Sequence, residues 1–352
     1  MRKKIITLIA LALCLSGIFT STALADSSKV VTLGANLSDS QKETMYQYFG
    51  VNKDEVEVIE VNNTEERQYL EGIASEETIG TRTYSCAYIE PTTSGGIQVK
   101  TANLTWVTSN MIASTLTTAG ITNCNVVAAC PIEVSGTGAL TGILKAYEVA
   151  SDNKLDEEKK QLATDELIET GELGDAIGKD EAVQLISEIK GEVIETQTIE
   201  PEEIEKIVTE HAENANVTLT DEQIAQITAL MGKIAAQDYN YDELKTTLDR
   251  IENNIGDYLN NASDEQKSFF TKILDSIKQL WDNIVNFFTG SKNEPEPETS
   301  TENNILDNTN DNILGDNVVT DNTSTTAATE NQMNQETESN SESIDNTEAV
   351  ID

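Results

Sequence analysis

The chain has 352 residues, with 62 Asp and Glu against 23 Lys and Arg, so its formal net charge is −39 at pH 7. Such a charge repels the phosphates of nucleic acids and of anionic lipids, which argues against nucleic-acid binding and against purely electrostatic attachment to a membrane. It favours solubility and contact with cations or basic partners.

The first 25 residues predict a cleavable signal peptide. A basic start at 2–4 precedes an apolar run over 5–19, and the small-x-small pattern at 23–25 lies directly before Asp26. We therefore expect a mature chain that begins at Asp26, has a formal charge of −42 and is extracellular or associated with the cell envelope. An uncleaved anchor is the alternative, but polar residues interrupt its apolar run.

Residues 26–150 are rich in β-branched residues and predict an α/β domain. Ser38 begins a capping box before a helix over 38–49, residues 55–61 alternate as in a half-buried strand, and the turn-rich link 91–96 suits an antiparallel hairpin. The expected order is strand 55–61, helix 63–73, strands 83–89 and 97–107, helix 109–120 and strand 124–129. This β-α-β-β-α-β order predicts a ferredoxin-like antiparallel sheet, flanked by helices near 38–49 and 139–150.

Three cysteines follow the signal peptide, in a compartment that permits disulfides. Cys124 and Cys130 lie in or beside one strand, too far apart for an easy bridge. We interpret Cys86, Cys124 and Cys130 as buried small apolar residues, with a Cys86–Cys124 bridge between strands as the alternative.

A glycine-rich stretch over 134–142 leads from a strand into a helix. Such a turn can present backbone N–H groups to an anion. Thr141 occupies the place of the third glycine of a dinucleotide fingerprint, so a tight turn with close helix packing is the better interpretation.

Residues 151–290 predict an all-α domain. Helix starts are visible at Pro201, at Thr220 and at Ser263, each followed by apolar residues at helical spacing. His211, the only histidine, lies on a charged helix and is interpreted as a solvated surface residue. No Cys-x-x-Cys or paired histidine spacing indicates a metal site, and no residue pattern predicts a catalytic site or a cofactor.

The strongest interaction signal is an amphipathic, Phe-rich helix predicted over 266–288. Its apolar residues recur at alternating steps of three and four, which produces one wide apolar face. This candidate interaction face consists of Phe270, Ile273, Ile277, Leu280, Trp281, Ile284 and Phe287. Packing against the domain's own helices is the preferred explanation for this face, and a partner helix or peripheral membrane contact is the alternative.

Residues 291–352 contain 15 acidic residues, one Lys and abundant Asn, Thr and Ser. This composition predicts a disordered acidic tail.

Five segments, 33–38, 85–89, 136–142, 171–174 and 185–190, resemble the YpuA-like family of exported Gram-positive proteins, a family built on a domain of unknown function. The resemblance runs from about Val31 to Leu259. It implies export and an envelope or extracellular setting, but it supplies no catalytic residues and does not cover the Phe-rich helix or the tail.

The sequence favours a secreted or envelope-associated binding module without catalytic activity over an enzyme. Its expected partner is an envelope protein or polymer. The alternative is a hydrolase of envelope polymers, with carboxylates that converge in a cleft between the two folded domains.

Overall fold

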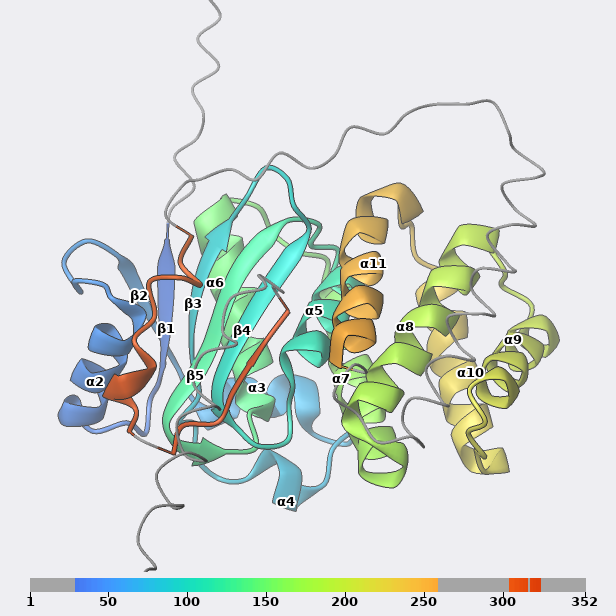
Figure 1. The fold of residues 1–352 in the computed structure, drawn as a ribbon, viewed down its shortest axis with the longest axis horizontal. Helices are drawn as coiled ribbons and strands as arrows, with labels where there is room; N and C mark the ends of the chain where they lie inside the picture. The colour runs from blue at the N-terminus through green and yellow to red at the C-terminus, as the bar shows by residue number, and fades with distance from the viewer. Residues whose placement is uncertain (1–28, 259–303, 316, 324–352) are drawn as a thin grey trace, which may run out of the picture.

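The computed structural model describes residues 29–258, 304–315 and 317–323. Within these residues, helices cover both faces of one mixed sheet, and a further group of helices packs beside it (Figure 1). The α+β class predicted from the sequence is therefore confirmed.

The sheet has the strand order β2-β1-β3-β5-β4-β6. The pairs β1–β2 and β4–β5 are parallel, whereas β1–β3, β3–β5 and β4–β6 are antiparallel. The strands are β1 (Val30–Gly34), β2 (Glu57–Val61), β3 (Cys86–Pro91), β4 (Ile97–Leu104), β5 (Cys124–Val134) and β6 (Thr320–Asn322).

The predicted ferredoxin-like strand order is not found, because β1 and β5 lie at positions that differ from it. The sequence pattern does not predict β1, which lies between β2 and β3. In addition, β5 lies between β3 and β4, so these two strands do not form the expected hairpin. The link 92–96 instead crosses the end of β5, a span of about 10 Å that five residues can bridge. Asn123 holds this link, because Gly96 N donates to Asn123 Oδ1 (2.9 Å).

Each face of the sheet has its own apolar core. On one face, Ile89, Val99 and Val126 pack against α5 (Ser109–Thr118) and α6 (Thr137–Ser151), next to α3 (Asn63–Leu70) and α4 (Glu76–Ile79). On the other face, Val31 and Val127 pack against α2 (Asp39–Phe49). The expected flanking helices therefore exist, but α2 and α6 lie on opposite faces.

Two of the helix starts predicted beyond residue 151, at Pro201 and at Thr220, are confirmed, and the third, at Ser263, lies outside the described residues. Thr220 forms a complete capping box, and Pro201 occupies the first turn of its helix. In the same way, Ser38 caps the start of α2 and Gly50 caps its end. These helices are α7 (Glu157–Ile177), α8 (Lys179–Thr196), α9 (Pro201–Asn214), α10 (Asp221–Ala235) and α11 (Tyr241–Tyr258).

The core of the sheet continues into this helical part. Leu167 of α7, Val183 of α8 and Ile251 of α11 belong to the same buried cluster as the strands and α5. Farther out, α9 and α10 close a second cluster around α8. Figure 1 shows these two helices at the end of the molecule farthest from α2.

Residues 304–315 and 317–323 are folded against the sheet, which corrects the prediction of a disordered tail for that part of the chain. Ile305 and Leu306 are 0% and 4% exposed and join the core under α2. Lys100 forms an ion pair with Asp311 (2.8 Å), and β6 extends the edge of β4. The average composition of the tail hides these two adjacent aliphatic residues, whose burial offsets the entropic cost of ordering the segment.

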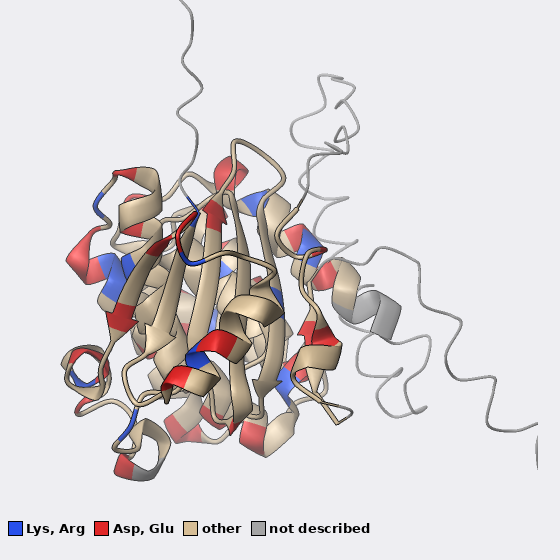
Figure 2. Cartoon of the chain, turned by 90° about the vertical axis from the view of Figure 1, so that its left-hand side faces the viewer, with Lys and Arg blue, Asp and Glu red and all other residues tan. Residues whose placement is uncertain are grey.

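Charged residues lie mainly on the helices and loops around the sheet. Figure 2 shows the α2 side, where Asp and Glu are spread over these outer elements and the strands carry few charges. Among the described residues, no helix combines the length and the apolar character that a membrane span requires.

Candidate functional site

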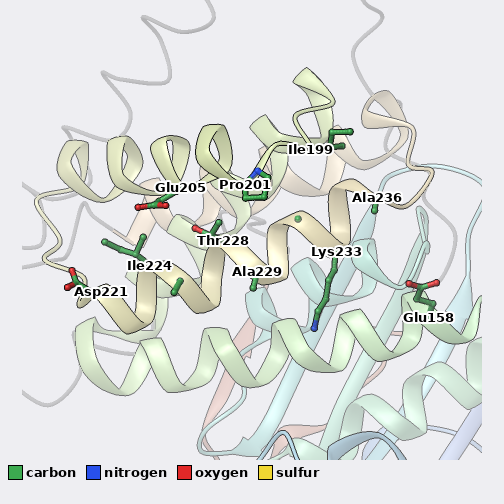
Figure 3. Close-up of a pocket in the computed structure, with 12 residues that line it drawn as sticks. Glu158, Ile199, Pro201, Glu205, Asp221, Ile224, Thr228, Ala229, Lys233 and Ala236 are labelled. Atoms are coloured by element: carbon green, nitrogen blue, oxygen red, sulfur yellow. The ribbon is translucent and has the colours of Figure 1, made fainter.

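A groove between α9 and α10 is the candidate binding site. Its volume is about 760 Å³, and it is open to solvent along one side. Figure 3 shows that Asp221 and Glu158 lie at its opposite ends, with Glu205 on the α9 side. The lining residues are Glu158, Ile199, Pro201, Glu205, Asp221, Ile224, Ala225, Thr228, Ala229, Gly232, Lys233 and Ala236.

The sequence of α10 explains the groove. Large apolar side chains such as Ile227, Met231 and Ile234 pack into the helical core. Small residues at 225, 229, 232 and 236 fall on the opposite, outward side, where they leave room for the backbone of another element. This spacing of small residues is the sequence signal that could have identified the groove.

The groove combines an apolar floor with an acidic rim. Ile199 lies at its edge and is 59% exposed, the largest exposed fraction among the exposed large hydrophobic residues of the described part of the chain. Three of its lining residues are acidic and one is basic, and that one, Lys233, faces Asp165 at 3.7 Å. Thr228 Oγ1 is buried and has no hydrogen-bond partner within the described residues.

A second feature is a group of polar side chains from α5, α7 and α8, called here the buried polar network. It lies at the junction between the sheet and the helices. Lys190 of α8 forms an ion pair with Glu166 of α7 (2.8 Å), and both side chains are 0% exposed. Ser114 Oγ of α5 donates to Glu166 Oε1 (2.7 Å), and Thr118 Oγ1 donates to the other carboxylate oxygen. Ser187 Oγ completes the network by donating to Ser114 Oγ (3.0 Å).

The buried polar network is enclosed by protein. Lys190 also donates to the backbone oxygen of Ser114 (2.8 Å) and to Thr118 Oγ1 (3.1 Å), so its ammonium group has three protein partners besides the hydroxyl of Ser114. Burial lowers the pKa of Lys190, and the negative charge of Glu166 opposes this effect. Where the hydrolase alternative expects an open cleft with carboxylates, the structure has a packed junction whose carboxylate is inaccessible to a polymer.

His211 is partly buried, which corrects its interpretation as a solvated surface residue. Its ring contacts Glu192 (Nε2 to Oε2, 2.7 Å) and Glu188 (Nδ1 to Oε2, 3.4 Å), two residues on one side of α8. Burial alone lowers the pKa of His211, but the hydrogen bonds and charges of the two carboxylates outweigh it and raise the pKa to about 9. The residue therefore connects α9 to α8 as a cation.

We expect His211→Asn to lower the free energy of unfolding by about 2 kcal/mol at pH 7, because two carboxylates lose their cationic partner. The folded pKa of about 9 lies above the unfolded value of 6.5, so the stabilisation is complete below about pH 6.5 and is lost as the pH rises through about 9. Urea unfolding at pH 6, 8 and 10 measures this. Glu213→Gln, an exposed change on the same helix, is the control, and a cost that does not shrink toward pH 10 would contradict the assignment.

The three cysteines are buried free thiols. Burial raises the pKa of Cys130 to about 11 and raises those of Cys86 and Cys124 further. The alternative bridge is not formed, because Cys86 lies opposite Ala129 and Cys124 lies opposite Pro91, at the two ends of the β3–β5 pair.

The glycine-rich turn packs tightly, as its preferred interpretation predicts. Gly136 has φ +95° and caps α6 without a side-chain hydrogen bond. A Cβ atom on Gly138 would lie 2.2 Å from Glu66 Oε1, so the glycine allows this carboxylate to approach the first turn of α6. Glu66 is 2% exposed, and burial raises its pKa. The Glu66 side chain therefore fills the space beside the first turn of α6, and its Oε1 accepts no hydrogen bond within the described residues.

The candidate interaction face of the 266–288 helix lies outside the described residues. This applies to all seven of its residues, Phe270, Ile273, Ile277, Leu280, Trp281, Ile284 and Phe287. The face stays a prediction, and the groove is a feature that the sequence interpretation did not include.

Comparisons with known proteins assign a family. Residues 33–251 match a family described as "Protein of unknown function (DUF1002)". An uncharacterized protein YpuA of Bacillus subtilis (strain 168) is 39% identical over 261 residues, which cover 74% of this chain and 89% of that protein. No solved structure shows a significant match. Because the family match covers most of the chain, the protein belongs to this DUF1002 family.

Proposed function

We propose that the protein is an exported binding module of the cell envelope without catalytic activity, and that the groove between α9 and α10 is its binding surface. The groove itself is the observation that carries this proposal. It is concave, has an apolar floor and lies on the outer helices, away from the buried core of the sheet.

The chemistry of the groove supports one class of ligand. Ala225, Ala229 and Gly232 allow close approach of a backbone, and Ile199 and Ile224 offer apolar contact. The acidic rim attracts Lys and Arg side chains. We therefore assign to the groove a helical segment of an envelope protein, with one apolar face and basic residues beside it.

The predicted helix over 266–288 supplies a second contact face in this proposal. Its wide apolar stripe suits a partner helix or the interfacial layer of the membrane. A signal peptide at 1–25 would bring both surfaces to the envelope.

The groove variant Ala229→Trp tests the proposal in the full chain. A large ring on this exposed alanine fills the floor of the groove and should weaken binding at least about tenfold, which corresponds to about 1.4 kcal/mol. We expect the native producer to retain the unmodified protein in its wall or membrane fraction and to release the variant into the medium. Quantitative immunoblots of the fractions measure the distribution.

Gln226→Trp is the matched control, because it places the same ring on an exposed residue of α10 that does not line the groove. Release of both tryptophan variants, or of neither, would argue against the groove. Trp281→Ala combined with Ile284→Ala tests the second face in the same way. Full recovery of the unmodified protein from the medium would overturn the envelope assignment itself.

A further inference from the structure

The edge of β4 is completed by a segment that is distant in the sequence. Backbone pairs align Lys100 with Asn322 and Ala102 with Thr320. Thr323 extends this contact, because its backbone N donates to Val99 O (2.8 Å) and its hydroxyl accepts from Val99 N (2.6 Å). Without this segment the edge of β4 would be unpaired, and an unpaired strand edge is a template for any extended chain with matching side chains.

Side chains make the contact specific. Asp321 Oδ2 accepts a hydrogen bond from Ser109 N at the start of α5 (2.7 Å), Asp311 pairs with Lys100, and Ile305 enters the core under α2. The β4 edge, called here the acceptor edge, therefore recognises a strand that is rich in Asp, Asn and Thr and that has aliphatic residues upstream. The chain itself contains such a segment, 304–323, called here the donor segment.

Covalent geometry does not restrict the donor segment to its own copy. Forty-five residues, 259–303, separate it from α11, and a chain of this length can span at most about 150 Å. The family match ends at residue 251, so the acceptor edge belongs to the family domain and the donor segment lies outside it.

We propose that the β4 edge also accepts the donor segment of a second copy, so that copies of this protein are linked by strand exchange. The contacts within one copy and between two copies are identical. The copy's own segment is favoured only by its tether, which provides an effective concentration of the order of millimolar. Exchange therefore becomes substantial where the concentration of the chain approaches that value, as it does for proteins crowded on a surface.

Two singly substituted full-length chains test this exchange. Ala102→Cys and Thr320→Cys replace residues that face each other across β4 and β6, so neither chain alone can form a 102–320 disulfide. After oxidation of an equal mixture, we expect covalent dimers with a 102–320 bond, identified by peptide mass spectrometry. Their yield should rise roughly fiftyfold between 10 µM and 1 mM total chain, because the tethered segment competes at about 1 mM. The doubly substituted chain is the control, in which we expect the bond to form within one copy.

The donor variant Ile305→Asp, added to the Thr320→Cys chain, should abolish these dimers by removing the apolar anchor. A second readout needs no disulfide: light scattering should show the unsubstituted chain gaining mass with concentration, and the Ile305→Asp chain should remain monomeric. The absence of 102–320 dimers at 1 mM, while the doubly substituted chain closes its internal bond, overturns the proposal. A mass that stays monomeric up to 1 mM overturns it as well. Neither outcome depends on the groove between α9 and α10.

Discussion

Lys190→Met is expected to lower the free energy of unfolding by about 4 kcal/mol, because it leaves the carboxylate of Glu166 buried without a cationic partner. Both side chains are 0% exposed, so water cannot replace the lost partner. Urea unfolding followed by circular dichroism measures the loss. The cost arises from the charge that remains, so its size depends on Glu166 more than on the packing of the lysine stem.

Glu166→Gln in the same chain separates these two contributions. Ser114 and Thr118 donate to different oxygens of Glu166, so the neutral amide keeps an acceptor for one of them and offers its NH2 group to the hydroxyl oxygen of the other. It also removes the uncompensated charge. We expect the double variant to recover at least half of the lost stability, which would show strong coupling between the two positions. Additive losses would mean that the pair does not form.

Lys206→Met is the control for the loss of a lysine. Lys206 and Glu210 form a pair at 3.7 Å in which both side chains are more than half exposed. Such a pair contributes at most about 0.5 kcal/mol, so the change should leave unfolding almost unaltered. A similar loss from Lys206→Met and Lys190→Met would contradict the role of burial.

Features that depend on neighbouring residues could be predicted from the sequence. The capping box at Ser38 and the helix start at Thr220 involve residues within four positions of each other, and the structure has them where they were expected. The α+β class follows from the shift in composition after residue 150. The interpretation of Cys86, Cys124 and Cys130 as buried residues is also confirmed.

Features that depend on distant pairing could not be predicted. The insertion of β5 between β3 and β4 is a choice among strand partners, and a single sequence contains no signal for it. Lys190 resembles a surface lysine on an amphipathic helix until Ser114, 76 residues away, is placed beside it. His211 differs from a solvated histidine only through Glu188 and Glu192 on another helix.

The donor segment shows the limit of composition as a guide. Residues 291–352 have the amino-acid composition of a disordered tail, yet Ile305 and Leu306 are buried in the core under α2. Order in such a segment depends on a few residues and on the surface that receives them. The average composition of residues 291–352 shows neither these few residues nor the surface that receives them.

The segments that carry the family resemblance serve the architecture. A Cβ atom on Gly34 would lie 2.5 Å from the backbone oxygen of Thr83, and one on Gly142 would lie 2.7 Å from Thr32 Oγ1. Gly138 and Gly171 make comparably close approaches, and the 185–190 segment supplies Lys190 to the buried polar network. These motifs therefore support the fold, and none of them lines the groove between α9 and α10.

Gly171→Ala is expected to destabilise the protein by about 2 kcal/mol, although alanine is the better helix former. Gly171 lies in the interior of α7, where an added Cβ would lie 2.1 Å from the indole ring of Trp106. The ring cannot move away freely, because Trp106 Nε1 donates to Asp175 Oδ2 (3.0 Å). Thermal and urea unfolding both report the loss.

Gly191→Ala is the matched control, because Gly191 also lies inside a helix, α8, and its added Cβ would meet only ordinary contacts at 3.6 Å or more. This change should stabilise the protein by about 0.5–1 kcal/mol through helix propensity alone. Trp106→Leu removes the indole, so Gly171→Ala in that background should approach the gain seen at Gly191. If Gly171→Ala stabilises the unmodified chain as Gly191→Ala does, Trp106 does not pack on α7, and the close contact between the sheet and the helical part is wrong at this point.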